Sequence, residues 1–229
     1  MRFSCIISVA LLLLNSSLVA KEMSSAELEK WFASDELHPP SFQTTEVNEG
    51  ELVFLSQIPV TDVHHHQNKL IIDSQSLASG WVRLQQCHNN LDQVGRAQIL
   101  FKKNKVKQIK IVSSKNIEQA WIEGNSVQLI NISEKAELCV EAVSRALIAN
   151  KDGSFSLRNG PFMRRFLDGY YPMHVSMQVL YSGTGLQLAS VSPASQQGFA
   201  VLKKPEQISY EAWFEGRLKT ELRFYPATM

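Results

Sequence analysis

From residue 51 onward, apolar and polar residues alternate along short segments of the chain. In HVSMQVLY, at 174–181, every second residue is apolar, and RLKTELRF at 217–224 repeats the pattern. A period of two places successive side chains on opposite faces of a β-strand. Other short aliphatic or β-branched runs stand between turn residues: ELVFL, KLIID, GWVRL, QILF, VKQIKIV and SVQLINI. Strands spaced in this way predict a mainly β protein with sandwich-like antiparallel sheets.

Residues 136–149, AELCVEAVSRALIA, fit two patterns. A helix beginning at Ser133 would bury Cys139, Val143 and Leu147 on one face. A strand would alternate the apolar residues with the residues between them. We favour a strand, because the neighbouring segments all have the β pattern.

The first 20 residues predict a secretory signal peptide. Arg2 is followed by an apolar run from Cys5 to Leu14, and small and polar residues then continue to Ala20. This run is well short of the roughly 20 residues that a membrane-spanning helix needs, and its charge, length and position are typical of an export signal. We therefore expect an exported, periplasmic mature chain without a transmembrane segment.

Residues 21–45 predict a short N-terminal helix and a proline-containing linker. Ser24 and Glu27 have the spacing of a capping box, and Trp31 and Phe32 fall on its apolar face. Two consecutive prolines then end the helix.

A short motif occurs twice in the β region. AWIEG at 120–124 recurs as AWFEG at 212–216, and a predicted strand follows each copy. We interpret the recurrence as an internal duplication. It predicts two related β subdomains, 46–133 and 134–229, with a hairpin turn at the Glu-Gly pair of each motif.

The charge of the chain limits the class of partner. The chain has 23 Lys and Arg and 22 Asp and Glu, and loss of Arg2 with the signal peptide would leave 22 of each. A nucleic-acid partner would require a surplus of cations, so none is expected. The local exception is a run of lysines from Lys102 to Lys110, which we interpret as an exposed hairpin whose charges oppose edge-to-edge strand pairing.

Two cysteines, Cys87 and Cys139, remain after removal of the signal peptide. In an oxidising compartment an even number of cysteines favours disulfides, and two cysteines allow one pairing. We expect a Cys87–Cys139 disulfide that ties the first subdomain to the second. The alternative is a thiolate metal site beside His88.

Histidines 64, 65 and 66 suggest a metal site. In a strand, His64 and His66 share a face, and His88 or His174 could supply a third ligand for Zn or Cu. The alternative is a solvated bend, because the Gln-Asn pair that follows at 67–68 is typical of a turn. We favour the bend, with the histidines splayed apart and their pKa values near 6.5.

The segment 157–174, LRNGPFMRRFLDGYYPMH, differs from the rest of the chain in its aromatic and arginine content. Its turn signals predict a long loop, and such residues often anchor interfaces or bind carboxylates and sugars. The alternative is a loop that covers the end of the sandwich. The candidate binding residues are Phe162, Arg164, Arg165, Asp168, Tyr170 and Tyr171.

The sequence contains none of the common hydrolase, metalloprotease, phosphate-binding or dinucleotide-binding motifs. The leading hypothesis is a non-enzymatic protein that binds an envelope protein or glycan through the 157–174 loop. The second is a periplasmic Zn- or Cu-binding protein, and the third is a hydrolase with a site assembled from loops.

Overall fold

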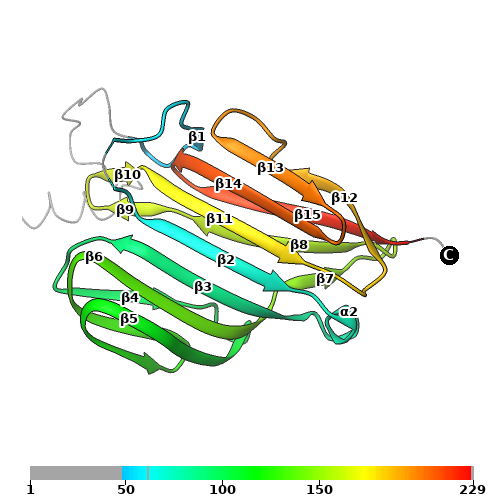
Figure 1. Cartoon of the computed structure of the whole chain (residues 1–229), viewed down its shortest axis with the longest axis horizontal. Coiled ribbons are helices and arrows are strands. Elements are labelled where there is room, and N and C mark those ends of the chain that lie inside the picture. The colour runs from blue at the N-terminus through cyan, green and yellow to red at the C-terminus, as the bar shows by residue number, and fades with distance from the viewer. Residues whose placement is uncertain (1–47, 61, 228–229) are drawn as a thin grey trace, which may run out of the picture. The chain divides into compact units, whose positions relative to one another are not determined.

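The computed structural model describes residues 48–60 and 62–227, which form a β structure with one short helix (Figure 1). The predicted signal peptide and N-terminal helix lie outside these residues. The elements are β1 (Val53–Phe54), β2 (His65–Ile71), α2 (Ser74–Ser79), β3 (Trp81–Leu91), β4 (Arg96–Leu100), β5 (Val106–Glu123), β6 (Ser126–Arg145), β7 (Leu147–Ala149), β8 (Phe155–Phe162), β9 (Arg164–Phe166), β10 (Gly169–Tyr171), β11 (Met173–Leu180), β12 (Leu186–Ser192), β13 (Phe199–Lys204), β14 (Gln207–Glu215) and β15 (Leu218–Pro226).

Most strands belong to two sheets. A nine-stranded sheet has the order β1-β14-β11-β2-β3-β6-β4, with β13 also paired to β14 and β5 to β6. A four-stranded sheet has the order β12-β15-β8-β7. The pairs are antiparallel, apart from the parallel pair β2–β11. Within the described ranges, no helix is long and apolar enough to cross a membrane.

The two sheets share one hydrophobic core. On β14, alternate residues such as Tyr210 and Phe214 are buried, and on β15 so are Leu222 and Phe224. All belong to a single cluster of buried side chains, and burial of each large apolar side chain contributes roughly 1.5–3 kcal/mol. The buried hydroxyls of Tyr210 and Thr220 lie 2.7 Å apart and link the sheets within this core. The predicted mainly β, sandwich-like fold is confirmed.

Strands β5 and β6 are unusually long and enclose a second core. The first half of β6 pairs with β4 and the second half with β3, while β5 follows β6 with three shifts of register. Positive φ angles at Asn131 and Lys135 interrupt β6 between its halves, and such irregularities bend a strand. The bend brings Val127 and Leu129 against Leu138 in the second cluster. Residues 136–149 are therefore extended, as we favoured. Residues 136–145 lie in β6 and residues 147–149 form β7.

The prediction of two duplicated subdomains is wrong. A boundary at 133/134 would cut β6 near its middle, and the described residues on both sides of it belong to one compact unit. The first motif does end β5 and turn into its hairpin partner β6. The second motif ends β14, but the following strand β15 belongs to the other sheet. The copies therefore lie in different topologies.

Gly216 occupies the corner between the two sheets. Its φ is 85°, and a Cβ there would lie 1.8 Å from the Glu51 carbonyl oxygen. Only glycine combines this backbone conformation with such a close approach of another chain segment. Gly124, in the first motif, has open space at the same position, so two similar sequences serve different structural purposes.

The predicted disulfide between Cys87 and Cys139 is confirmed. The two residues are directly paired between β3 and β6, with Cα atoms 4.1 Å apart. The bond therefore joins neighbouring strands of one sheet, and the expected link between subdomains does not exist. A bond between these strands also fastens the long, bent β6 to the centre of the large sheet.

We predict that replacing both cysteines with alanine lowers the free energy of unfolding by about 4 kcal/mol, because the bond closes a loop with a sequence separation of 52 residues in the unfolded chain. Urea denaturation of the oxidised protein and of the double variant measures the difference. Reduced wild-type protein is the control and should match the variant. Equal stability of the oxidised and reduced proteins would contradict the prediction.

Candidate functional site

The segment predicted as a long loop is ordered into strands. Residues 157–162 belong to β8, and β9 and β10 form a two-stranded hairpin in which Arg164 pairs with Tyr171. Leu167 and Asp168 form its turn, between Phe166 and Gly169. Figure 1 shows this hairpin just before β11, which places it at one end of the sandwich. The prediction of an irregular loop is therefore wrong, although turn residues do occupy the tip.

The base of the hairpin is held by two arginines. The Arg164 guanidinium donates to both oxygens of Asp92, with Nε 3.1 Å from each and Nη2 2.5 Å from Oδ1. Arg217 Nε donates to the hydroxyl of Tyr170 over 2.7 Å, and Tyr170 is buried. A bidentate arginine–carboxylate pair fixes orientation as well as position. The hairpin therefore projects from the sandwich in one defined direction.

The tip of the hairpin exposes apolar side chains. Leu167 is fully exposed, and Phe166 and Tyr171 expose 38% and 36% of their surface. The rings of Phe166 and Tyr171 meet edge to face at 5.4 Å. We call Phe166, Leu167 and Tyr171 the apolar tip, whereas the exposed Met163 lies at the other end of the hairpin, just before Arg164. Large contiguous exposed apolar surface is rare on monomeric proteins and marks interaction sites.

The six predicted binding residues divide into two groups. Phe162 and Tyr170 are buried, and Arg164 belongs to the base. Arg165, Asp168 and Tyr171 are exposed near the tip. Asp168 accepts a 2.5 Å hydrogen bond from the Tyr171 hydroxyl, which raises the pKa of that tyrosine.

The sequence interpretation did not include Phe166 and Leu167 of the tip among the binding residues. The available signal was the position of Leu167 in the turn, before Asp-Gly, where a polar residue is the usual choice.

His64 immediately precedes β2, the histidines at 65, 66, 88 and 174 lie on strands, and the alternation of side chains places the five on two faces. Gln67 and Asn68 belong to β2, so the predicted bend is wrong. His66 pairs with His88 on the core-facing side, together with His64, whereas His65 and His174 face outward. The predicted shared face of His64 and His66 is therefore correct, but His174 lies on the opposite face from both.

His64, His66 and His88 form an inner histidine cluster instead of splaying apart. His64 Nε2 lies 2.9 Å from His88 Nδ1, and the rings of His66 and His88 are 4.4 Å apart. Gln86 Nε2, which can only donate, lies 2.6 Å from His88 Nε2. With the Gln86 amide in this orientation, His88 accepts at Nε2, which assigns its proton to Nδ1 and makes it the donor to His64.

In the part of the chain that the structure describes, no group of three or more His, Cys, Asp or Glu side chains is placed to hold a metal ion.

The pKa values of these histidines are not ordinary. Burial lowers the pKa of His64 to about 4 and that of His66 to about 3, and it lowers the pKa of His88 well below 6.5. For His64, the nearby Asp92 raises the pKa and Arg164 lowers it further. The inner histidine cluster is therefore neutral at neutral pH, and it lies next to the ion pair at the base of the hairpin.

The outward histidines form a stack with a tryptophan. His174 lies between His65 and Trp213, with ring centroids 3.7 Å and 3.9 Å away. His65 Nε2 contacts Ser176 Oγ at 2.6 Å, and His174 Nε2 contacts Glu211 Oε1 at the same distance. We call His65, His174 and Trp213 the outer stack. The stacking and the two hydrogen bonds together hold the His65 and His174 rings in place on the outer face.

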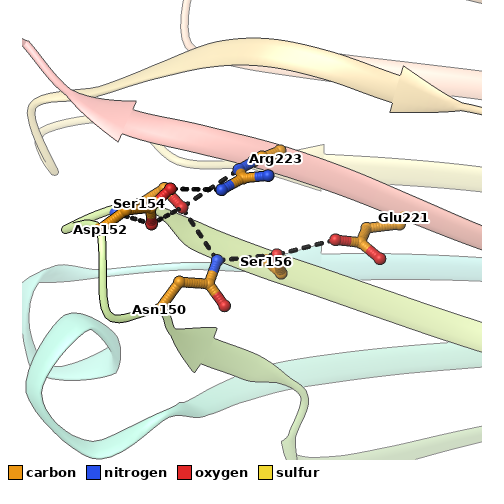
Figure 2. A network of polar contacts seen from close by, with 6 residues as sticks. All are labelled: Asn150, Asp152, Ser154, Ser156, Glu221 and Arg223. Carbon is orange, nitrogen blue, oxygen red and sulfur yellow. Dashed lines mark hydrogen bonds and ion pairs between the residues drawn. The ribbon is translucent and has the colours of Figure 1, made fainter.

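A separate polar network lies at the β7–β8 turn (Figure 2). Asn150 Nδ2 donates to the hydroxyls of Ser154 and Ser156, both over 2.9 Å. Ser156 donates to Glu221 on β15 over 2.9 Å, and this hydrogen bond lowers the pKa of Glu221. Arg223, also on β15, bonds Asp152 and Ser154. The hydroxyls are thus engaged in fastening the turn to β15, which is a structural use of serine.

We predict that the free energy of unfolding falls as the pH is lowered from 6.5 towards 4. The unfolded chain protonates its histidines near pH 6.5, whereas the folded chain keeps His64 and His66 neutral until about pH 4 and 3. Each such histidine costs about 1.4 kcal/mol per pH unit within this window. Urea denaturation at pH 7.5, 6 and 5 should show this decrease in the free energy of unfolding. In His66→Gln the decrease should be smaller by the contribution of one histidine. An unchanged slope in the variant would contradict the assignment.

We also predict that Asp92→Ala loosens the hairpin, because it leaves the partly buried Arg164 unpaired. Such a loss costs roughly 1–3 kcal/mol, so amide exchange within 164–171 should accelerate about fivefold or more. The matched control is Glu137→Ala, which breaks the exposed Lys115–Glu137 pair and should leave the hairpin unchanged. Equal exchange in both variants would show that the ion pair does not brace the hairpin.

Comparison with known proteins does not assign the chain to a family. No protein-family model and no curated protein sequence matches it. Among solved structures, it is similar to the M1 zinc metallopeptidase from Deinococcus radiodurans, with 13% identity, a TM-score of 0.37, and coverage of 79% of this chain and 43% of the peptidase. A mutant of that peptidase bound to a Tyr-Ser-Ala substrate gives 10% identity, a TM-score of 0.39, and coverage of 72% and 42%. The chain spans less than half of these peptidases, and a likeness this distant says nothing about its activity.

Proposed function

We propose that the protein is a non-enzymatic, exported component of the cell envelope that binds a partner protein through the apolar tip of the β9–β10 hairpin. The observation that carries this proposal is the full exposure of Leu167 at the end of a braced hairpin, beside the exposed rings of Phe166 and Tyr171. When a partner covers such an apolar residue, the free energy of binding gains roughly 25 cal/mol per Å² of apolar surface removed from water.

The rigidity of the hairpin favours binding. An interface loses affinity when loops and side chains must become ordered on association. Here Arg164–Asp92 and Arg217–Tyr170 order the hairpin beforehand. Aromatic residues and arginine are also enriched at the centres of protein interfaces. The tip therefore fits a partner with an apolar pocket and an acidic rim that could receive the exposed Arg165.

The proposed location rests on the sequence and is consistent with the disulfide. Residues 1–20 have the features of an export signal. The Cys87–Cys139 bond is of the kind that persists in an oxidising compartment such as the periplasm. An envelope protein is accordingly the class of partner that the hairpin would meet.

We predict that Leu167→Asp weakens partner binding about 30-fold, as expected for a central anchor residue worth about 2 kcal/mol. The variant should remain as stable as the wild type within about 0.5 kcal/mol, because Leu167 makes no buried contact. A photo-crosslinking residue at position 166, introduced in the native envelope, identifies the partner. Binding of the purified partner is then measured by calorimetry.

Leu100→Asp is the matched control, because Leu100 is also a largely exposed leucine but lies at the end of β4. It should bind the partner as the wild type does. Equal losses in the two variants would contradict a role for the hairpin. Binding of the hairpin to lipid vesicles, with no captured protein, would contradict a protein partner.

A further inference from the structure

The outer face of the large sheet carries a groove that the function proposed above does not use. Strands β13, β14, β11, β2 and β3 lie side by side there (Figure 1). The groove has a volume of about 560 Å³ and crosses these strands. Four inter-strand spacings of about 4.8 Å give it a width of about 19 Å. The four-stranded sheet covers the opposite face of the same strands.

The side chains at the centre of the groove are polar and nearly neutral in sum, whereas Ala200 and Leu202 on β13 and Cys87 on β3 line its edges. Residues paired in register share a face, so two rows cross the strands. The first row contains Gln67, Ser176 and Glu211, and the second contains Lys69, Gln178 and Ser209. The six supply amides, hydroxyls, one ammonium and one carboxylate.

Part of this lining is held in place and part is free. The outer stack holds one edge, because His65 bonds Ser176 and Gln67, and His174 bonds Glu211. Within the described ranges, no protein hydrogen bond engages the side chains of Lys69, Gln178 and Ser209, so these can bind a ligand. A surface with fixed and free hydrogen-bonding groups side by side suits a ligand rich in hydroxyls.

We infer that this groove binds an uncharged oligosaccharide. The lining offers both donors and acceptors, which sugar hydroxyls can satisfy. It lacks the excess of cations that a nucleic acid requires, and its centre lacks the apolar anchor of a protein interface, since the exposed Leu202 lies on the edge strand β13. Its span across five strands accommodates several linked sugar units. The groove is separate from the apolar tip, so the two sites would recognise ligands of different chemistry.

Three neutral hexasaccharides (cellohexaose, chitohexaose and maltohexaose) are suitable probes, with hyaluronan hexasaccharide as the charged comparison. Calorimetry should show that at least one neutral probe binds the full chain with a dissociation constant below millimolar. Gln178→Leu should weaken this binding about fivefold, since one hydrogen bond contributes roughly 1 kcal/mol. The fluorescence of Trp213, beside the groove, should change on binding.

Gln187→Leu is the matched control, because Gln187 is an exposed glutamine on β12 of the other sheet. It should bind the hexasaccharide as the wild type does. Ser209→Tyr, which fills the groove, should abolish binding while thermal unfolding stays cooperative. Leu167→Asp should bind normally, which separates this inference from the proposed function. Absence of binding to all three neutral probes, binding of hyaluronan alone, or equal losses in Gln178→Leu and Gln187→Leu would overturn it.

Discussion

The structure depends on the burial of one face of the central strands β2, β11 and β14 against the four-stranded sheet. Because side chains alternate along a strand, this single constraint assigns every residue of these strands to the core or to the outer face. It places Met177 and Tyr210 in the core, and it places Ser176 and Glu211 in the open groove. A slip by one residue would exchange the two sets, so core burial also specifies the composition of the outer surface.

The same alternation explains why histidines occur inside the protein. The core-facing side of β2 and β3 becomes polar towards one end, where His66 pairs with His88. Buried polar groups are stable only when hydrogen-bonded, and here His64, His88 and Gln86 bond one another. The inner histidine cluster therefore fills the end of the core with hydrogen-bonded polar side chains. On the opposite face of the sheet, His65 and His174 stack on each other.

The hairpin is connected to this polar end of the core through Asp92 and Arg164. These two groups influence the protonation of His64 in opposite directions, while together they hold the base of the hairpin. Tyr170 and Arg217 fix the other strand of the hairpin. A rigid base with an exposed apolar tip is suited to recognition by a partner protein. The neutral polar groove has different chemistry, so the chain offers two recognition surfaces on one framework.

Local patterns in the sequence were sufficient to predict the β class, the extended state of 136–149, the Cys87–Cys139 pair and the common face of His64 and His66. Each of these follows from the period of a strand or from the number of cysteines, and needs no knowledge of distant contacts. The pairing of strands does need it: AWIEG and AWFEG are nearly identical, yet one ends in a hairpin and the other crosses to a second sheet through Gly216. Asn68 resembles a turn residue but lies in β2, where it bonds His66. Tertiary contacts outweighed these local preferences, and only they decided which histidines meet and which side chains remain exposed at the hairpin tip.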